Sequence, residues 1–230
     1  MQQQPPASPE VLAPAARSPV FAYPPDEVEF FPDDYFAPLN LAAMFPGRDT
    51  APLEIDLGCG DGGFLVEIAG RAPERNFLGV ERLMGRVRKT CRRTARSALR
   101  NVRVMRIETT YFLRYLLPRE SASILHLMFP DPWPKRRHQS RRIFQTEFLD
   151  AALNVLTPGG EIRFTTDDLP YYRHALEVAA GHDGFRQEPW EPDADYPQTD
   201  FERGFRGQGL PIHRLLLRKT RRPVDPVTNP

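Results

Sequence analysis

The segment at residues 129–142, FPDPWPKRRHQSRR, combines residue types that can hold a nucleobase beside its phosphate backbone. It carries one carboxylate, Asp131, between two prolines, and one large aromatic side chain, Trp133. A carboxylate can accept hydrogen bonds from the N–H groups of a base, and an indole ring can stack on its face. Five Lys or Arg side chains and a histidine follow, and such groups bind phosphates. A packed core tryptophan and a solvated basic surface are the alternative interpretations.

A set of carboxylates follows the ends of five apolar segments that are typical of strands. They are Asp56, Glu81, Glu108, Asp131 and Asp167. In a parallel α/β sheet the carboxyl ends of the strands share one edge, where ligands bind. The sequence therefore predicts that these carboxylates converge on one ligand site. An acid at the end of the second strand can accept hydrogen bonds from both hydroxyls of a ribose.

The turn after Asp56 fits the GxGxxG pattern, with glycines that include Gly58 and Gly60. Such glycines let the backbone turn sharply and let a ligand approach the start of a helix. A dinucleotide would bring a pyrophosphate here, which the charges of Asp56 and Asp61 oppose. S-adenosylmethionine (SAM) carries an ammonium and a sulfonium instead, so electrostatics favour SAM. A tight turn without a ligand remains the alternative.

Charge is distributed unevenly along a nearly neutral chain. The 230 residues include 31 Lys or Arg and 30 Asp or Glu, for a formal net charge of +1. Residues 82–106 hold ten Lys or Arg and no acid, and residues 135–142 hold five more. This concentration indicates a polyanionic partner at one face, although two solvated helix faces would give the same pattern.

The remaining bulk features favour a cytoplasmic protein without a membrane segment or a metal. The two cysteines form no CxxC pair, and the five histidines are scattered. No apolar run reaches the ~18–20 residues of a membrane span, and residues 1–20 lack the pattern of a signal peptide. We expect a disordered tail at residues 1–25, one domain at 26–222 and a C-terminal tail at 223–230. Both a monomer and a homodimer are compatible with these features.

The elements that must position these groups alternate between strands and helices. Strands are expected at residues 53–57, 76–81, 101–108, 123–130 and 161–167. Helices are expected from about residue 62 and at 85–99, 110–117, 144–156 and 171–180. Two final strands, 184–190 and 212–219, flank an irregular segment at 191–210. The pattern predicts an α/β, Rossmann-like fold: a largely parallel seven-stranded sheet with an antiparallel C-terminal hairpin and helices on both faces.

Six motifs together resemble the bacterial tRNA (guanine-N7-)-methyltransferases. They are IDLGCGDGGFLVEIA, FLGVE, VRVMRIE, FPDPWPKRRHQSRRI, TTDDLPYY and TDFERGFRGQG, in that family's order. The PDPWPKxRHxxRR run and the late TxFE motif are specific to the family, whereas most SAM methyltransferases share the glycine motif. The resemblance implies a SAM-methyltransferase fold and methyl transfer from SAM to N7 of a guanine in the tRNA variable loop.

The resemblance also implies roles for individual residues. The implied SAM contacts are Asp56, Gly58, Gly60, Glu81, Glu108 and Asp131. The implied substrate contacts are Lys135, Asp167, Thr199, Asp200, Phe201 and Glu202. Asp131 is the expected catalytic residue, and it can contact the guanine, the amino end of SAM, or both. In the TxFE motif, Asp200 replaces the lysine of many family members.

Guanine N7 carries a free lone pair, so its methylation needs positioning and charge stabilisation rather than a strong base. Three other functions remain open from the sequence. An amino-methyltransferase on another nucleic acid or on protein would use a D/N-P-P-Y/W corner, and Asp131-Pro132-Trp133 lacks the second proline. A non-catalytic RNA-binding module would not need the set of acids and glycines. An NAD-dependent oxidoreductase would need catalytic side chains that are not evident here.

Overall fold

The structure is a computed structural model that describes residues 25–220. The predicted tails, residues 1–25 and 223–230, lie outside the described residues apart from Pro25, where the first helix begins. The tails and the domain boundary at 26–222 therefore stay predictions.

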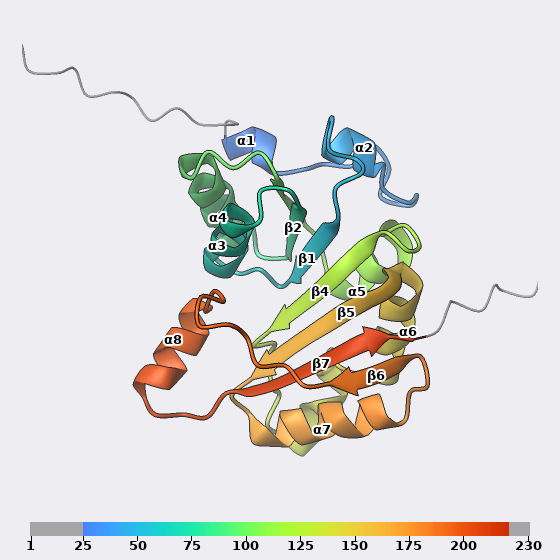
Figure 1. Ribbon diagram of the computed structural model, residues 1–230, viewed down its shortest axis with the longest axis vertical. Helices are drawn as coiled ribbons and strands as arrows, with labels where there is room; N and C mark the ends of the chain where they lie inside the picture. Colours follow the sequence, from blue (N-terminus) through green and yellow to red (C-terminus); the bar gives the residue numbers. More distant parts are fainter. Residues whose placement is uncertain (1–24, 221–230) are drawn as a thin grey trace, which may run out of the picture.

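The described chain forms one seven-stranded sheet (Figure 1). Its strands are β1 (Leu53–Leu57), β2 (Asn76–Glu81), β3 (Val102–Arg106), β4 (Ala122–Met128), β5 (Leu156–Thr166), β6 (Phe185–Glu188) and β7 (His213–Lys219). They lie in the order β3-β2-β1-β4-β5-β7-β6, and β7 alone runs antiparallel to its neighbours. The predicted fold class is thereby confirmed, with β7 inserted between β5 and β6.

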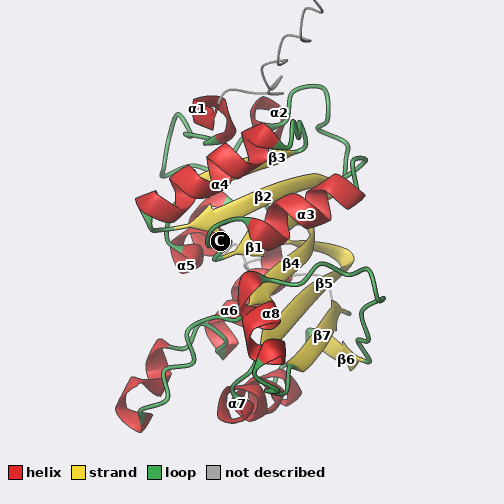
Figure 2. Cartoon of the chain, turned by 90° about the vertical axis from the view of Figure 1, so that its left-hand side faces the viewer, coloured by secondary structure: helices red, strands yellow, loops and turns green. Residues whose placement is uncertain are grey.

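Helices cover both faces of the sheet. They are α1 (Pro25–Val28), α2 (Leu41–Met44), α3 (Gly63–Arg71), α4 (Met84–Arg96), α5 (Thr109–Tyr111), α6 (Thr146–Val155), α7 (Leu169–Ala180) and α8 (Asp200–Gly207). A π-helical turn, Phe112–Leu116, continues α5, and a 3₁₀ helix, Arg136–Arg141, follows β4. Figure 2 shows α3 and α4 across the β1–β3 half of the sheet, and α6 and α7 pack with β4 and β5 in a second core. Because both faces are covered, every residue of β1 and β2 is buried.

Helix α4 shows how the basic stretch of the sequence folds. Val87, Cys91 and Ala95 recur at helical spacing and are buried against β2 and β3. The basic side chains of the helix occupy the opposite face and are exposed. The helix therefore presents a positive surface to solvent without a charge in the core.

Two expectations about local structure were wrong. The segment predicted to be irregular, residues 191–210, contains α8, which Thr199 caps by accepting a hydrogen bond from the backbone N–H of Glu202 at 2.9 Å. The strand predicted at 161–167 begins earlier, because the TPGG sequence at 157–160 belongs to β5. There the pairing with β4 is interrupted, and Gly159 takes a positive φ of 72°.

The face of β1 and β4 next to α3 carries buried polar groups. The ring Nε2 of His126 lies 2.7 Å from a carboxylate oxygen of Glu54, and the hydroxyl of Tyr196 lies 3.3 Å from its Nδ1. Burial lowers the pKa of His126 and outweighs the effect of Glu54. Burial alone would raise the pKa of Glu54, but the bond to His126 lowers it. The pair is therefore an ionised Glu54 that accepts a hydrogen bond from a neutral His126.

Candidate active site

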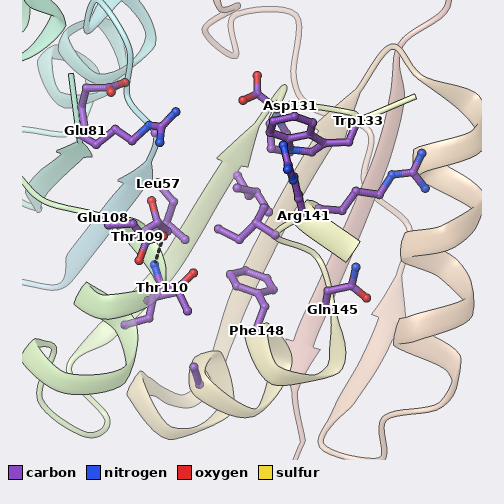
Figure 3. Close-up of a pocket in the computed structure, with 18 of the residues that line it drawn as sticks. Leu57, Glu81, Glu108, Thr109, Thr110, Asp131, Trp133, Arg141, Gln145 and Phe148 are labelled. Carbon is purple, nitrogen blue, oxygen red and sulfur yellow. Dashed lines mark hydrogen bonds between the residues drawn. The ribbon is translucent and has the colours of Figure 1, made fainter. Parts of the chain in front are cut away.

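A cavity of about 660 Å³ lies at the carboxyl ends of β1 and β4. These two strands are neighbours, and the strand order reverses between them, which is where open α/β sheets bind ligands. Figure 3 shows Glu81 and Glu108 on one side of the cavity and Asp131 and Trp133 on the other. The volume is in the range that holds a small ligand.

The turn after β1 forms one rim of this cavity. The backbone N–H groups of Gly58 and Cys59 both donate to the carbonyl of Val80, at 2.8 and 3.0 Å. Gly58 and Gly60 have φ values of +82° and +57°, which favour glycine, and no atom stands within 4 Å of where a Cβ on Gly58 would lie. The open backbone at Gly58 leaves space for a ligand to approach closely.

Glu81 ends β2 inside the cavity and is only 6% exposed. One carboxylate oxygen accepts a hydrogen bond from the backbone N–H of Leu83 at 2.8 Å. The other oxygen lies 3.9 Å from the guanidinium of Arg86, which begins the basic face of α4 and also lines the cavity. The side chain is thus fixed in orientation while one oxygen remains available to a hydroxyl donor.

Asp56 lies in β1, next to β2, and is 3% exposed. Within residues 25–220 its carboxylate has no hydrogen-bond partner. Burial, together with the negative charge of Glu81, raises the pKa of Asp56 to about 7. A cationic ligand would stabilise the ionised form, so Asp56 and Glu81 fit the ammonium and sulfonium charges of SAM.

Glu108 stands at the start of α5, on the β3 side of the cavity. Its two carboxylate oxygens accept the backbone N–H groups of Thr110 and Tyr111, at 2.9 and 2.8 Å. The side chain is therefore an N-cap that is held in place at the cavity wall (Figure 3).

Asp131 lies on an exposed, strained corner after β4. The two residues that bracket it, Phe129 and Trp133, have positive φ values of 51° and 45°, which are unfavourable for bulky residues. The guanidinium carbon of Arg141 lies 5.0 Å from the ring centre of Trp133. The rings of His138 and Trp133 are nearly perpendicular, with their centres 5.9 Å apart. Strain of this kind persists only where the surroundings hold it, and it concentrates at functional sites.

The structure brings some of the predicted site residues together and leaves others outside the cavity. Of the six predicted SAM contacts, Gly58, Glu81, Glu108 and Asp131 line the cavity, whereas Asp56 and Gly60 are not among its lining residues. Lys135 is exposed at the start of the 3₁₀ helix, and Asp167 is half-buried directly after β5. Neither of these two side chains lines the cavity, so their roles remain predictions.

The remaining predicted substrate contacts belong to α8. Thr199 caps this helix, Phe201 is exposed, and Asp200 lies 2.5 Å from Arg203 and 4.0 Å from Arg93. Helix α8 lies beyond the carboxyl ends of β4 and β5 (Figure 1). There the ring centres of Phe205 and of Phe129 in the strained corner are 5.6 Å apart, with the rings tilted.

Glu202, the last of the predicted substrate contacts, is buried. It is 4% exposed and accepts hydrogen bonds from Arg206, at 2.9 Å, and from Arg214 of β7. The glutamate therefore anchors α8 to the sheet in this structure.

The sequence did not indicate several of the residues that line the cavity. Arg86, Thr109, Arg141 and Phe148 also line the cavity. Arg141 stands in the basic run that the sequence assigned to phosphates, and Arg86 is in the basic helix. Their position relative to the cavity depends on how elements distant in sequence pack together, and the local pattern carries no signal for that.

Within residues 25–220, no group of three or more His, Cys, Asp or Glu side chains is placed to hold a metal ion. In the same range, no helix is long and apolar enough to cross a membrane.

The sheet order, the glycine turn and the carboxylates in the cavity define a Rossmann-like, SAM-dependent methyltransferase. Two solved structures share this fold. The 16S rRNA methyltransferase KamB has a TM-score of 0.56 at 18% identity, covering 79% of this chain and 94% of that one. A SAM-dependent O-methyltransferase from Thermotoga maritima has a TM-score of 0.51 at 14% identity, covering 80% of this chain and 65% of that one.

Comparison of sequences defines the family. A model described as "Putative methyltransferase" matches residues 50–215. A tRNA (guanine-N(7)-)-methyltransferase from Syntrophotalea carbinolica is 40% identical over 188 residues, 80% of each chain. One from Geobacter metallireducens is 33% identical over 195 residues, 82% of this chain and 91% of that one. The chain belongs to the tRNA (guanine-N7-)-methyltransferase family, which confirms the resemblance in its motifs.

Proposed function

We propose that this chain transfers the methyl group of SAM to N7 of a guanine in the variable loop of tRNA, in the cytoplasm. Membership of the family supports the reaction, methyl transfer from SAM, and the substrate class, tRNA. The structural observation that carries the site is the cavity between the ends of β1 and β4, where the acids and the strained corner meet. Both cysteines are free and buried, in keeping with a reducing compartment.

The acids on the β1–β3 side are the proposed SAM contacts. SAM supplies a methyl group on a positively charged sulfur. Glu81 accepts hydrogen bonds from the ribose hydroxyls, and Glu108 accepts from the adenine amino group. Asp56 lies behind the turn and stabilises the positive charges of the ligand. Gly58 and Gly60 let the ligand lie against the backbone.

Asp131 is the proposed catalytic residue because it stands on the opposite side of the cavity, beside an aromatic ring. It accepts hydrogen bonds from guanine N1–H and N2–H₂, which turns N7 toward the interior, while Trp133 stacks on the base. The N7 lone pair forms the new bond to the methyl carbon, and the pair of the broken bond stays on sulfur. Positive charge thereby moves onto the purine, where Asp131 stabilises it.

The basic surfaces are the proposed tRNA contacts. Lys135 and the exposed arginines of the 3₁₀ helix adjoin the corner, and the exposed face of α4 starts at Arg86 in the cavity wall. Phosphates of the tRNA backbone bind along these surfaces while Asp131 reads the base. Asp167 and the segment that includes Thr199, Asp200, Phe201 and Glu202 are proposed to face the same substrate.

Product mapping tests this function. The full chain is incubated with methyl-labelled SAM and bulk tRNA, and the product is cleaved with borohydride and aniline, which break the chain at 7-methylguanosine. We expect label in 7-methylguanine and cleavage at one variable-loop guanosine, and no label with Asp131→Ala. Label in N6-methyladenine or in protein would falsify the proposal.

A further inference from the structure

Arg142 is a buried cation at the base of the strained corner. Its side chain is 3% exposed, although it directly follows a 3₁₀ helix with no buried residue. Burying a guanidinium is costly unless its N–H groups find partners, and its planar fork suits contacts in fixed directions. The positions of its partners therefore indicate what the side chain does.

One partner is the corner itself. The Nε of Arg142 donates a hydrogen bond to the carbonyl of Pro132 at 2.8 Å. That carbonyl belongs to the peptide that joins Pro132 to Trp133, where the backbone has the unfavourable φ of 45°. The hydrogen bond thus holds the strained peptide one residue after Asp131.

The other partners belong to the start of α7. The Nη2 of Arg142 lies 3.9 Å from a carboxylate oxygen of Asp168, and its guanidinium carbon lies 4.8 Å from the ring centre of Tyr171. Asp168 caps α7 by accepting the backbone N–H of Tyr171 at 2.7 Å, and it directly follows Asp167. Nη2 has no hydrogen-bond partner within residues 25–220, so Asp168 and the Tyr171 ring hold this end of the side chain, and Arg142 also lines the cavity.

We propose that Arg142 is a positioning residue that fixes the corner carrying Asp131 against the start of α7, and so sets the separation of Asp131 from Asp167. These two carboxylates follow the neighbouring strands β4 and β5, and no other described side chain bonds Pro132 and faces Asp168. The inference rests on the proposed function only for its kinetic test.

Fluorescence of Trp133 tests the positioning independently of catalysis. The chain has two tryptophans, so Trp190→Phe leaves Trp133 as the single reporter. In this background we expect Arg142→Lys to raise the acrylamide quenching constant by about twofold, because an ammonium lacks the planar fork. The melting temperature and the affinity for adenosylhomocysteine serve as controls of folding.

A second variant keeps the inference testable if Arg142→Lys does not fold. Asp168→Asn retains an oxygen that can cap α7 but removes the charge that faces Arg142. We expect a smaller change of Trp133 quenching in the same direction. Quenching that matches the parent protein in every folded variant would overturn the inference.

Kinetics separate positioning from a general loss of structure. At saturating SAM and tRNA we expect Arg142→Lys to lower kcat by about tenfold or more, with the KM for SAM unchanged, because a small displacement of a reading group slows the reaction. An equal loss of kcat and of adenosylhomocysteine affinity would contradict positioning. If the unmutated chain forms no 7-methylguanosine, the proposed function fails, and the fluorescence test still decides the role of Arg142.

Discussion

Asp56 and Glu81, on the neighbouring parallel strands β1 and β2, place one buried carboxylate within the field of another. Burial and the charge of Glu81 raise the pKa of Asp56 from its ordinary value of 3.8 to about 7. The free protein thus holds an acid that is costly to ionise and that a bound cation would stabilise. This relationship predicts opposite effects on stability and on binding.

Asp56→Asn is expected to stabilise the free protein at pH 8 and to weaken ligand binding. Between pH 4 and 7 the unfolded chain releases the Asp56 proton before the folded one does, so the unfolding free energy falls as pH rises through this window. A shift of this size corresponds to a loss on the order of 4 kcal/mol above pH 7. Thermal melts of both proteins at pH 5 and pH 8 measure this loss. The same difference in melting temperature at both pH values would contradict the prediction.

The same acid predicts the pH dependence of binding. If Asp56 stabilises the ligand ammonium as proposed, adenosylhomocysteine affinity for the unmutated protein should decline as pH falls below about 7, because the Asp56 carboxylate becomes protonated. Titration calorimetry across pH 5.5–8.5 measures this dependence, and Asp56→Asn should flatten it. A flat profile for the unmutated protein would remove Asp56 from the site.

Gly62→Ala is expected to destabilise the fold by about 2–5 kcal/mol. Gly62 has a φ of 75°, and a Cβ there would overlap the Thr90 side chain of α4. Gly85→Ala is the matched control, because that helical glycine has open space and the change should stabilise by about 0.5–1 kcal/mol. Urea unfolding of both variants measures the difference, and equal midpoints would show that the turn tolerates a side chain.

Lys135→Ala combined with Arg137→Ala is expected to weaken tRNA binding and to reduce its salt dependence. Two phosphate contacts would be lost, so the slope of log affinity against log salt should decrease by about two. Arg173→Ala, on the exposed side of α7, is the control and should leave the slope unchanged. Filter binding between 50 and 200 mM salt measures the slope. An unaltered slope in the double variant would mean that Lys135 and Arg137 are solvated and do not contact phosphates.

Glu202→Gln is expected to loosen α8 and to lower stability by about 3 kcal/mol, because two arginines lose a buried carboxylate. Thr199→Ala removes only the helix cap and should cost about 1 kcal/mol. Hydrogen exchange of the α8 amides, followed for both variants, separates the two effects. Equal protection of α8 in Glu202→Gln and in the unmutated chain would contradict an anchoring role.

The sheet could be predicted because local patterns determine it. Mainly apolar segments such as Leu53–Leu57 and Asn76–Glu81 became buried strands, and Val87, Cys91 and Ala95, spaced four residues apart, form the buried face of α4. The acids at the strand ends followed from the rule that parallel strands share one carboxyl edge. That rule placed Glu81, Glu108 and Asp131 around one cavity.

Features that depend on tertiary contacts were not predicted. The sequence of α8 contains two glycines and many charges, and its helix depends on the bond of Glu202 to Arg214, a residue of β7. The TxFE sequence carried a usable signal, since Thr and Glu three residues apart form the pattern of a capping box. No sequence pattern distinguished Arg142 as a buried residue, because it ends a run of basic residues whose other Lys and Arg side chains are exposed.

A crystal structure of the full chain with adenosylhomocysteine tests the central claim most directly. We predict the ribose at Glu81, the adenine beside Glu108 and the sulfur between the β1 turn and Asp131, within the cavity at the ends of β1 and β4. A nucleoside bound elsewhere on the molecule, with this cavity vacant at saturating ligand, would contradict the account.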